Sequence, residues 1–544
     1  MSPENDDITV DGSNDQSEFV RVPANEREFM GHPVGLFVLF FTEMWERFSY
    51  YGMRALLVLY LVQEINSENP GLGWSDSDAG SLYGWYTMLV YITPILGGII
   101  ADKILGFKKA ITIGAVLMSL GHFALAFDPM PAFYLGLGLL IVGNGFFKPN
   151  ISSMVGQLYP DGSAKKDSGY TIFYQGINVG AFLGSILCGY LAETIGWHYG
   201  FGLAGIFMVV GMIQFQLAQK LFGSIGASPK KGNLKDNQDI VDSIKETKIL
   251  KKKEPLTKKE RDRLLVVGVL AFFSIFFWAA FEQAGSSMNI FASEYTERSL
   301  SGSSVLTFKI VSAIISLLPV VILTWLFVGT MKNVGREYRS AIGFMAISIL
   351  LLLGLVGFVI YDQFTAENIE VPATWFQSLN ALFIFTLAPL FSWIWQALAK
   401  TKINPSGPQK FSIGLILLGL GFIPLVYGAA GFTGESDIQK VSMIFLILAY
   451  LLHTMGELSL SPVGLSYVSK LSPKRLVGVM FGIWFFASAM GNMAAGQFSG
   501  YMTKIAETST MSDFFQILVM IPIVAGIVLF ILSFPIKRLM HGIH

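Results

Sequence analysis

The sequence comprises 544 residues, of which 53% are hydrophobic and only 14% are charged, and its mean hydropathy is +0.55. This composition is too apolar for a soluble globular protein and predicts an all-α polytopic membrane protein. The 38 basic and 38 acidic residues give a formal net charge of zero. No signature of DNA or RNA binding accompanies that balance, so we expect no nucleic-acid partner.

The first 32 residues are polar and acidic. They lack the basic start and the apolar core of a cleavable signal peptide. Such a segment has too little apolar surface to fold alone, so residues 1–32 are predicted to be a disordered cytoplasmic leader. The first spanning helix must then direct insertion by itself.

Apolar stretches that are long enough to cross a bilayer, which takes roughly 20 residues, follow one another along the rest of the chain. The predicted spans are 34–63, 79–102, 110–128, 133–158, 168–192, 199–221, 264–291, 306–329, 339–361, 373–399, 411–430, 441–468, 475–501 and 513–536. With the N-terminus inside, most loop Lys and Arg residues fall on the cytoplasmic side, as the positive-inside rule requires. We therefore expect both termini, including the tail 537–544, to be cytoplasmic.

The polar segment 222–263 divides the spans into six and eight, and it holds twelve basic and seven acidic residues from Lys230 to Arg263. Two six-helix halves joined by a cytoplasmic linker are the layout of the major facilitator fold, so two spans are surplus. The spans within 306–361 are almost wholly apolar, which favours an extra lipid-facing hairpin. The domains are then an N-terminal bundle at 33–221, the basic linker at 222–263, and a C-terminal bundle made of 264–291 and 373–536.

Charged residues inside the apolar spans indicate a polar site. The first span carries Glu43, Glu46, Arg47 and Arg54 on one broad helical face. An ionisable group near the bilayer centre costs at least about 2.5–3.5 kcal/mol, so this face must look into a cavity with charged partners on other helices. A structural ion-pair cluster without a ligand is the alternative reading.

Two further charges lie inside later spans. Lys148, in the fourth span, lies at the depth of Glu43 to Arg47 and calls for a counter-ion there. Counting residues from the cytoplasmic ends places Arg54 and Glu282 together in the outer half of the membrane. This pair is therefore a candidate outer gate between the two halves.

Six motifs occur in order across residues 33–536. They are Glu43-x-x-Glu46-Arg47-Phe-x-Tyr50-Tyr51-Gly52, Phe147-Lys148-Pro149-Asn150, Phe173-Tyr174-x-x-Ile177-Asn178-x-Gly180, Trp278-x-x-Phe281-Glu282-Gln283, Phe376-Gln377-Ser378-Leu379-Asn380 and Gly456-Glu457-Leu-x-Leu-Ser461-Pro462-Val463-Gly464. Together they resemble the set shared by proton-dependent oligopeptide transporters, the POT/PTR family of the major facilitator superfamily. The resemblance implies a proton-coupled symporter that imports di- and tripeptides across the inner (plasma) membrane by alternating access.

The resemblance also implies roles for individual residues. A zwitterionic peptide needs a cationic pole, here Arg47 and Lys148 assisted by Tyr50 and Tyr86, and an anionic pole, here Glu457 with Asn178 and Asn380. Trp278 and Trp484 would form walls of the side-chain pockets. The candidates for proton coupling and gating are Glu43, Glu46, Arg47, Arg54, Lys148 and Glu282. The residues do not rank the three glutamates among these.

The chain departs from the family at Gly84, where animal members carry a histidine, so a histidine proton site at that position is excluded. His122 and His453 are expected to be packed, and the single Cys188 has no disulfide partner. No hydrolytic or metal-ligand motif occurs, so we predict no enzyme activity and no cofactor besides the coupling proton. The expected partners are di- and tripeptides, protons and the lipid bilayer, and the oligomeric state is open. A peptide-binding membrane sensor, or a same-fold transporter of another small anionic or zwitterionic solute, is the alternative.

Overall fold

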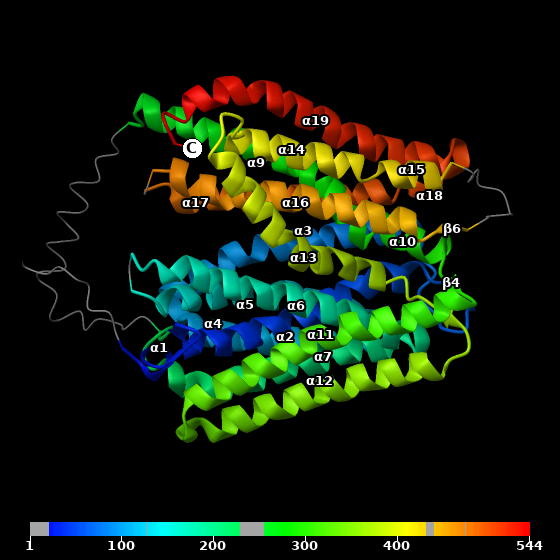
Figure 1. Ribbon diagram of the computed structural model, residues 1–544, viewed down its shortest axis with the longest axis horizontal. Coiled ribbons are helices and arrows are strands. Elements are labelled where there is room, and N and C mark those ends of the chain that lie inside the picture. Colours follow the sequence, from blue (N-terminus) through cyan, green and yellow to red (C-terminus); the bar gives the residue numbers. More distant parts are fainter. Residues whose placement is uncertain are drawn as a thin grey trace, which may run out of the picture.

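The computed structural model describes residues 21–127, 129–160, 162–228, 255–430, 440–473 and 475–543. Long helices run side by side along one direction, and the short strands lie only at the ends of the bundle (Figure 1). The predicted all-α class is therefore confirmed. Helix α1 and the C-terminal end of α19 lie at one end, named here the α1 end. Helices α10 and α18 lie at the other, the α18 end.

Six long helices form the N-terminal bundle. They are α2 (Val34–Val62), α3 (Asp76–Ile100), α4 (Phe107–Leu125), α5 (Met130–Gln157), α6 (Lys165–Thr194) and α7 (Trp197–Ala218), with two short turns, η1 (Ala101–Leu105) and η2 (Gln219–Phe222). Helix α2 packs along α6 and α7 and is buried over nearly its whole length. Its charged residues consequently face protein and the interior rather than lipid.

The helices of the C-terminal bundle contain more interruptions than predicted. It comprises α9 (Lys258–Phe281), η3 (Glu282–Gly285), α10 (Ser287–Glu294), α13 (Trp375–Ala399), α14 (Gly407–Leu420), α15 (Ile423–Gly428), α16 (Ile444–Leu471), α17 (Val477–Ser499), α18 (Met502–Thr508) and α19 (Met511–Leu539). The predicted span 264–291 is thus interrupted by a 3₁₀ turn that begins at Glu282. The predicted span 411–430 is likewise split between α14 and α15.

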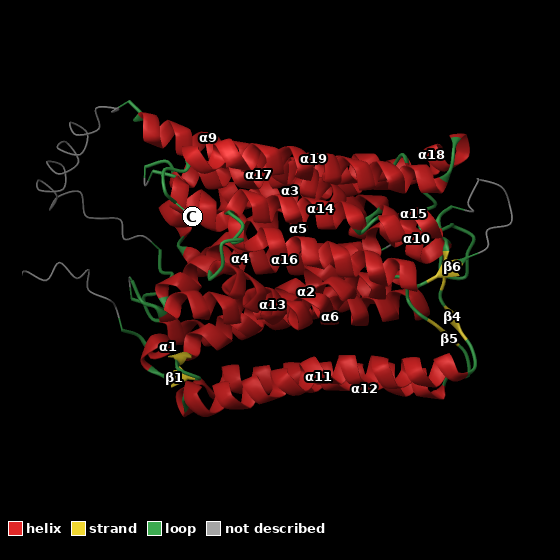
Figure 2. Ribbon diagram, turned by 45° about the horizontal axis from the view of Figure 1, so that its top comes forward, coloured by secondary structure: helices red, strands yellow, loops and turns green. Residues whose placement is uncertain are grey.

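The surplus hairpin consists of α11 (Ser303–Val334) and α12 (Arg339–Thr365), joined by η4 (Arg336–Tyr338). Although it is inserted within the C-terminal bundle in sequence, it packs on the N-terminal bundle: α12 contacts α7 and α6, and α11 contacts α2. Figure 2 shows the hairpin at one edge of the molecule. Large apolar side chains such as Trp325, which is 57% exposed, cover its outer surface, which suits contact with lipid.

The predicted disordered leader is too long at its C-terminal end. Residues 23–33 form α1 (Pro23–Glu26) and a pair of short strands, β1 (Glu28–Phe29) and β2 (His32–Pro33). Arg27 forms an ion pair of 2.6 Å with Glu337 of the hairpin turn, and the Phe29 ring lies 5.9 Å from that of Trp325. Contacts with the bundle and the hairpin therefore order this segment. Residues 1–20 lie outside the described part of the chain.

Most of the predicted linker, residues 229–254, also lies outside the described residues. The predicted linker extends too far at its C-terminal end, because α9 begins at Lys258 and residues 258–263 are helical. The Thr257 hydroxyl accepts a hydrogen bond from the backbone N–H of Glu260, and the Glu260 carboxylate accepts one from the N–H of Thr257. This capping box fixes the start of α9.

Twelve helices of the described chain are long and apolar enough to cross a membrane, judged by length and composition. The predicted count of fourteen is therefore not confirmed. The two predicted spans outside the twelve are α2, which carries four charged residues, and α4, which has 19 residues and begins with two lysines after Phe107. Both nevertheless pack inside the N-terminal bundle against spanning helices.

The two bundles meet closely where α3 packs against α17 and where α6 packs against α13. Glycines allow the first of these approaches. A Cβ atom at Gly84 would lie 2.9 Å from the carbonyl oxygen of Met493 and 3.2 Å from the Cα of Gly496. Position 84 has no room for a larger side chain, which gives a packing reason for the glycine there.

Two pairs of short strands tie the connectors together at the α18 end. Strand β3 (Thr296–Glu297) pairs with β6 (Val441–Ser442), and β4 (Ser299–Leu300) pairs with β5 (Ile369–Glu370). The second pair joins the two connectors that lead into and out of the hairpin, so the hairpin has a cross-linked base.

Candidate functional site

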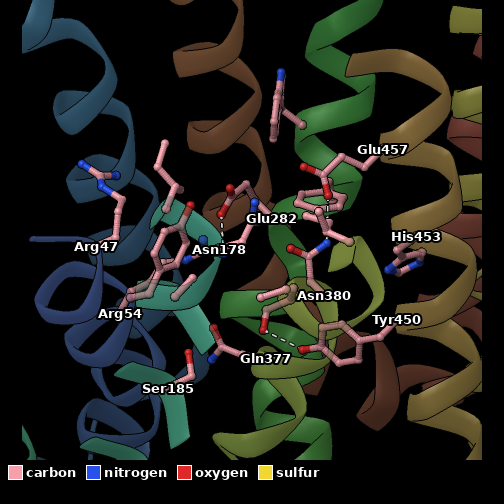
Figure 3. Close-up of a pocket in the computed structure, with 18 of the residues that line it drawn as sticks. Arg47, Arg54, Asn178, Ser185, Glu282, Gln377, Asn380, Tyr450, His453 and Glu457 are labelled. Carbon is pink, nitrogen blue, oxygen red and sulfur yellow. Dashed lines mark hydrogen bonds and ion pairs between the residues drawn. The ribbon is translucent and has the colours of Figure 1, made fainter. Parts of the chain in front are cut away.

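A cavity of about 230 Å³ lies between the two bundles. It is small for a ligand pocket, since such pockets typically hold roughly 300–1,000 Å³. Helices α2, α3, α5 and α6 contribute to one side, and α9, η3, α13 and α16 to the other (Figure 3). The polar residues of its lining are Arg47, Tyr51, Arg54, Tyr91, Lys148, Tyr174, Asn178, Ser185, Trp278, Glu282, Gln377, Asn380, Tyr450, His453 and Glu457.

Arg47 is fixed by two carboxylates of its own helix. Its Nε lies 3.2 Å from Glu43 Oε1, and its Nη2 donates to Glu46 Oε1 at 2.7 Å, while Nε also contacts the second oxygen of Glu46. Glu43 and Glu46 are buried and lie outside the cavity lining, and Glu43 Oε2 has no hydrogen-bond partner in the described part of the chain. The guanidinium thus reaches the cavity wall with its charge already compensated from behind.

Lys148 has a different environment. Its ammonium lies 4.7 Å from the centre of the Tyr91 ring, a favourable cation–π distance. Within the described residues, no carboxylate oxygen lies within 4.0 Å of Lys148 Nζ. The expected close counter-ion is therefore not found in this state, because Arg47 engages both nearby glutamates. Lys148 lines the cavity without an ion pair.

Glu457 lies across the cavity from Arg47, on α16 (Figure 3). Asn380 of α13 donates from Nδ2 to Glu457 Oε2 at 2.8 Å and also contacts the Thr454 hydroxyl at 3.2 Å. No lysine or arginine of the described chain forms an ion pair with Glu457. Among the described residues, the cavity lining therefore has one cation and one anion without an ion-pair partner, and they come from different bundles.

An ion pair between the bundles lines the cavity on the side of the α18 end. Arg54 Nη2 of α2 lies 2.8 Å from Glu282 Oε2 of η3. Tyr83 of α3 joins both, since Arg54 Nε donates to its hydroxyl at 2.8 Å and that hydroxyl donates to Glu282 Oε2 at 3.2 Å. The sequence predicted that Arg54 and Glu282 lie at the same depth, and in the structure they are in contact. Tyr83, which sequence analysis missed, contacts both residues.

Six of the nine predicted substrate-binding residues line the cavity: Arg47, Lys148, Asn178, Trp278, Asn380 and Glu457. The other three residues are not part of the cavity lining. Tyr50 packs under the Arg47 guanidinium at 5.3 Å, Tyr86 is 2% exposed, and Trp484 packs edge-on against Phe411.

Several aromatic and amide residues of the lining were not predicted. Tyr51 lines the cavity, whereas Tyr50 was expected to do so. The two residues differ by about 100° around the helix, so both fall on its broad polar face and the sequence did not separate them. Tyr450 precedes Glu457 by seven residues, and His453 precedes it by four. That helical spacing is a signal that could have identified both residues.

Comparison with known proteins identifies the family. A model of the PTR2 proteins, described as the POT family, matches residues 108–235 and 360–518. The peptide transporter YePEPT of Yersinia enterocolitica subsp. palearctica is 33% identical over 564 residues, with 95% of this chain and 97% of the relative covered. The chain belongs to the POT family. A di-/tripeptide transporter of Lactococcus lactis subsp. cremoris is 32% identical and covers 95% of this chain and 98% of its own length.

Solved structures of POT transporters have the same fold. A crystal structure of peptide transporter POT in complex with sulfate matches with a TM-score of 0.72 and 30% identity, covering 96% of this chain and 99% of that chain. A POT family transporter in complex with 5-aminolevulinic acid matches with a TM-score of 0.73 and 27% identity, covering 95% and 99%. The family resemblance seen in the six motifs is confirmed, and the chain is a membrane transporter of this family rather than an enzyme.

Proposed function

We propose that this POT family protein imports di- and tripeptides together with protons. Relatives that are named as peptide or di-/tripeptide transporters support the substrate class. The observation that carries the proposal is a pair of charges, Lys148 and Glu457, that come from different bundles to one cavity and have no ion-pair partner among the described residues. A zwitterion with one carboxylate and one ammonium complements that pair, and a simple anion would leave Glu457 without a partner.

The peptide carboxylate would bind at Lys148 and Arg47, and the peptide ammonium at Glu457. Asn380 already holds the Glu457 carboxylate in place, and Asn178 and Trp278 provide neighbouring polar and apolar wall. Tyr50, Tyr86 and Trp484 are buried and lie outside the cavity lining, so we assign them a positioning role. A cavity of about 230 Å³ suits a small solute.

Proton coupling is proposed to act through Glu282. Protonation would remove the negative charge that holds Arg54, and a buried pair that loses one charge is strongly weakened. Among the three candidate glutamates, Glu282 lines the cavity, whereas Glu43 and Glu46 lie behind Arg47. This access favours Glu282 as the site that exchanges protons with the cavity. Glu43 and Glu46 would tune Arg47.

We further propose fourteen spans in the inner (plasma) membrane, with the α1 end and both termini in the cytoplasm. The helix ends and connections at the α1 end carry basic residues that include Lys103, Lys165, Lys332 and Lys400, as the positive-inside rule requires. The α18 end is then the outer end. The Arg54–Glu282 pair joins the two bundles at this end, so it would hold the outer end closed in an alternating-access cycle.

The test is uptake of labelled dialanine into proteoliposomes with an inward proton gradient. Wild-type protein should accumulate the peptide, an uncoupler should abolish accumulation, and both Glu457→Gln and Lys148→Ala should lose it. Binding by the wild type without accumulation would instead indicate a peptide sensor. Failure to bind dialanine would indicate another solute.

A further inference from the structure

Glu193 makes a polar contact between the bundles, on helices that do not carry the Arg54–Glu282 pair. It lies near the C-terminal end of α6, in the N-terminal bundle. Its Oε2 accepts a hydrogen bond from the backbone N–H of Ala373 at 2.8 Å, and its Oε1 accepts from the N–H and the hydroxyl of Thr374 at 2.9 and 2.7 Å. These two residues immediately precede α13 of the C-terminal bundle. One carboxylate thus receives three hydrogen bonds across the interface.

The electrostatics of this contact favour a carboxylate. The N-terminus of a helix carries a partial positive charge, and hydrogen bonds to an ionised acceptor are stronger than neutral ones. Arg298 adds a full charge, with Nη1 at 3.6 Å from Glu193 Oε2. The Glu193 side chain is only 15% exposed, so water and salt screen these interactions weakly.

The surface of α6 is shaped to receive the start of α13. A Cβ atom at Gly189, one helical turn before Glu193, would lie 2.0 Å from the Thr374 hydroxyl oxygen. One turn earlier, the carbonyl oxygen of Ile186 accepts a hydrogen bond from the Trp375 indole at 3.0 Å. Three successive turns of α6 therefore contact residues 373–375, and the close approach needs the glycine.

We propose that Glu193 with residues 373–375 forms a second outer gate contact, which must break and re-form in every transport cycle. This inference rests on the proposed alternating access, because opening the α18 end requires α6 to separate from the start of α13. The contact holds the outer end closed together with the Arg54–Glu282 pair. Weakening it raises the population of molecules that are open at the α18 end, without any change in the substrate cavity.

The test measures the width of the α18 end directly, with no peptide present. Spin labels are attached to cysteines introduced at Glu68 and Lys504, one exposed site in each bundle, after the native Cys188 has been replaced by alanine. Electron–electron double resonance in lipid nanodiscs then gives the distance distribution. Glu193→Gln keeps the shape but loses the charge, and it should at least double the fraction of molecules with the longer separation.

Glu370→Gln is the matched control. Glu370 also pairs with Arg298, at 2.7 Å, but it is 57% exposed. It lies in a connector of the hairpin and does not join the two bundles. The spin-label distance distribution of the Glu370→Gln variant should therefore equal that of the wild type. A wild-type distribution for Glu193→Gln would overturn the proposal. Because no peptide is used, this result is independent of whether the protein carries peptides.

Two further variants decide the question if Glu193→Gln fails to fold. Thr374→Val removes one of the three donors, and Gly189→Ala inserts a methyl group between α6 and Thr374 without altering charge. Both should shift the distribution towards the longer distance. Unchanged distributions for both, in protein with wild-type thermal stability, would overturn the proposed contact.

Discussion

Replacing Glu457 by glutamine should weaken the binding of free dialanine far more than that of N-acetyl-dialanine. The acetylated peptide has no ammonium, so it gains nothing from the carboxylate. Two unit charges 4 Å apart at an effective dielectric constant of 20 attract by about 4 kcal/mol, which is an upper limit before desolvation. A hydrogen bond to a charged group contributes a net of about 1.5–3 kcal/mol. That range corresponds to roughly a tenfold to 150-fold loss of affinity.

The structure makes glutamine a suitable replacement, because Asn380 donates to Glu457 at 2.8 Å and can still donate to the amide oxygen. Affinities of both peptides would be measured by titration calorimetry on purified wild type, Glu457→Gln and Lys148→Met. Lys148→Met should reduce the affinity for both peptides alike, since both carry the carboxylate. An equal loss for the two peptides in Glu457→Gln, or no loss at all, would refute the assignment of Glu457 to the ammonium.

Three other outcomes are expected. Glu282→Gln should retain peptide counterflow in proteoliposomes but lose gradient-driven uptake; loss of both would remove it as the proton site. Gly84→Ala should cost about 1–3 kcal/mol by overpacking, seen as a lower melting temperature, whereas Gly138→Ala, with nothing within 4 Å, should not. Arg27→Ala breaks an ion pair whose side chains are 39% and 53% exposed, so the melting temperature should shift little, as for a pair worth under about 1 kcal/mol.

Hydropathy predicted where the long helices are, but not how each one ends or what it packs on. Helix α9 has no proline, and its glycine, Gly268, lies 14 residues before the break at Glu282. The 3₁₀ turn follows from tertiary contacts of Glu282 with Arg54 and Tyr83. The side on which the hairpin docks was equally inaccessible. Helices α11 and α12 are apolar all round, so no polar face reveals which surface meets protein. Their position on the N-terminal bundle depends on contacts such as the Tyr190 hydroxyl with Asp362.

The sequence singled out Arg47 and Lys148 because charged residues inside apolar spans are rare and costly, whereas Glu457 was assigned to the anionic pole through the family resemblance. The sequence did not predict which of the charged residues form ion pairs with one another. Arg47 is on the same helix as both nearby glutamates: Glu43 lies four residues before it and on the same face, and Glu46 directly precedes it. Arg47 therefore pairs with both carboxylates, and the Lys148 ammonium on α5 lies against the Tyr91 ring instead.

This sharing of partners bears on how the cavity distinguishes its substrates. Glu43 and Glu46 pair with Arg47, and Glu282 pairs with Arg54, so these five groups are already engaged with one another. Lys148 and Glu457 are the charged residues of the lining without an ion-pair partner in the described chain. A neutral zwitterion satisfies both at once, whereas a simple anion or cation satisfies one and leaves the other buried and unpaired, which is costly. Discrimination would then come as much from the penalty on the unsatisfied pole as from attraction at the satisfied one.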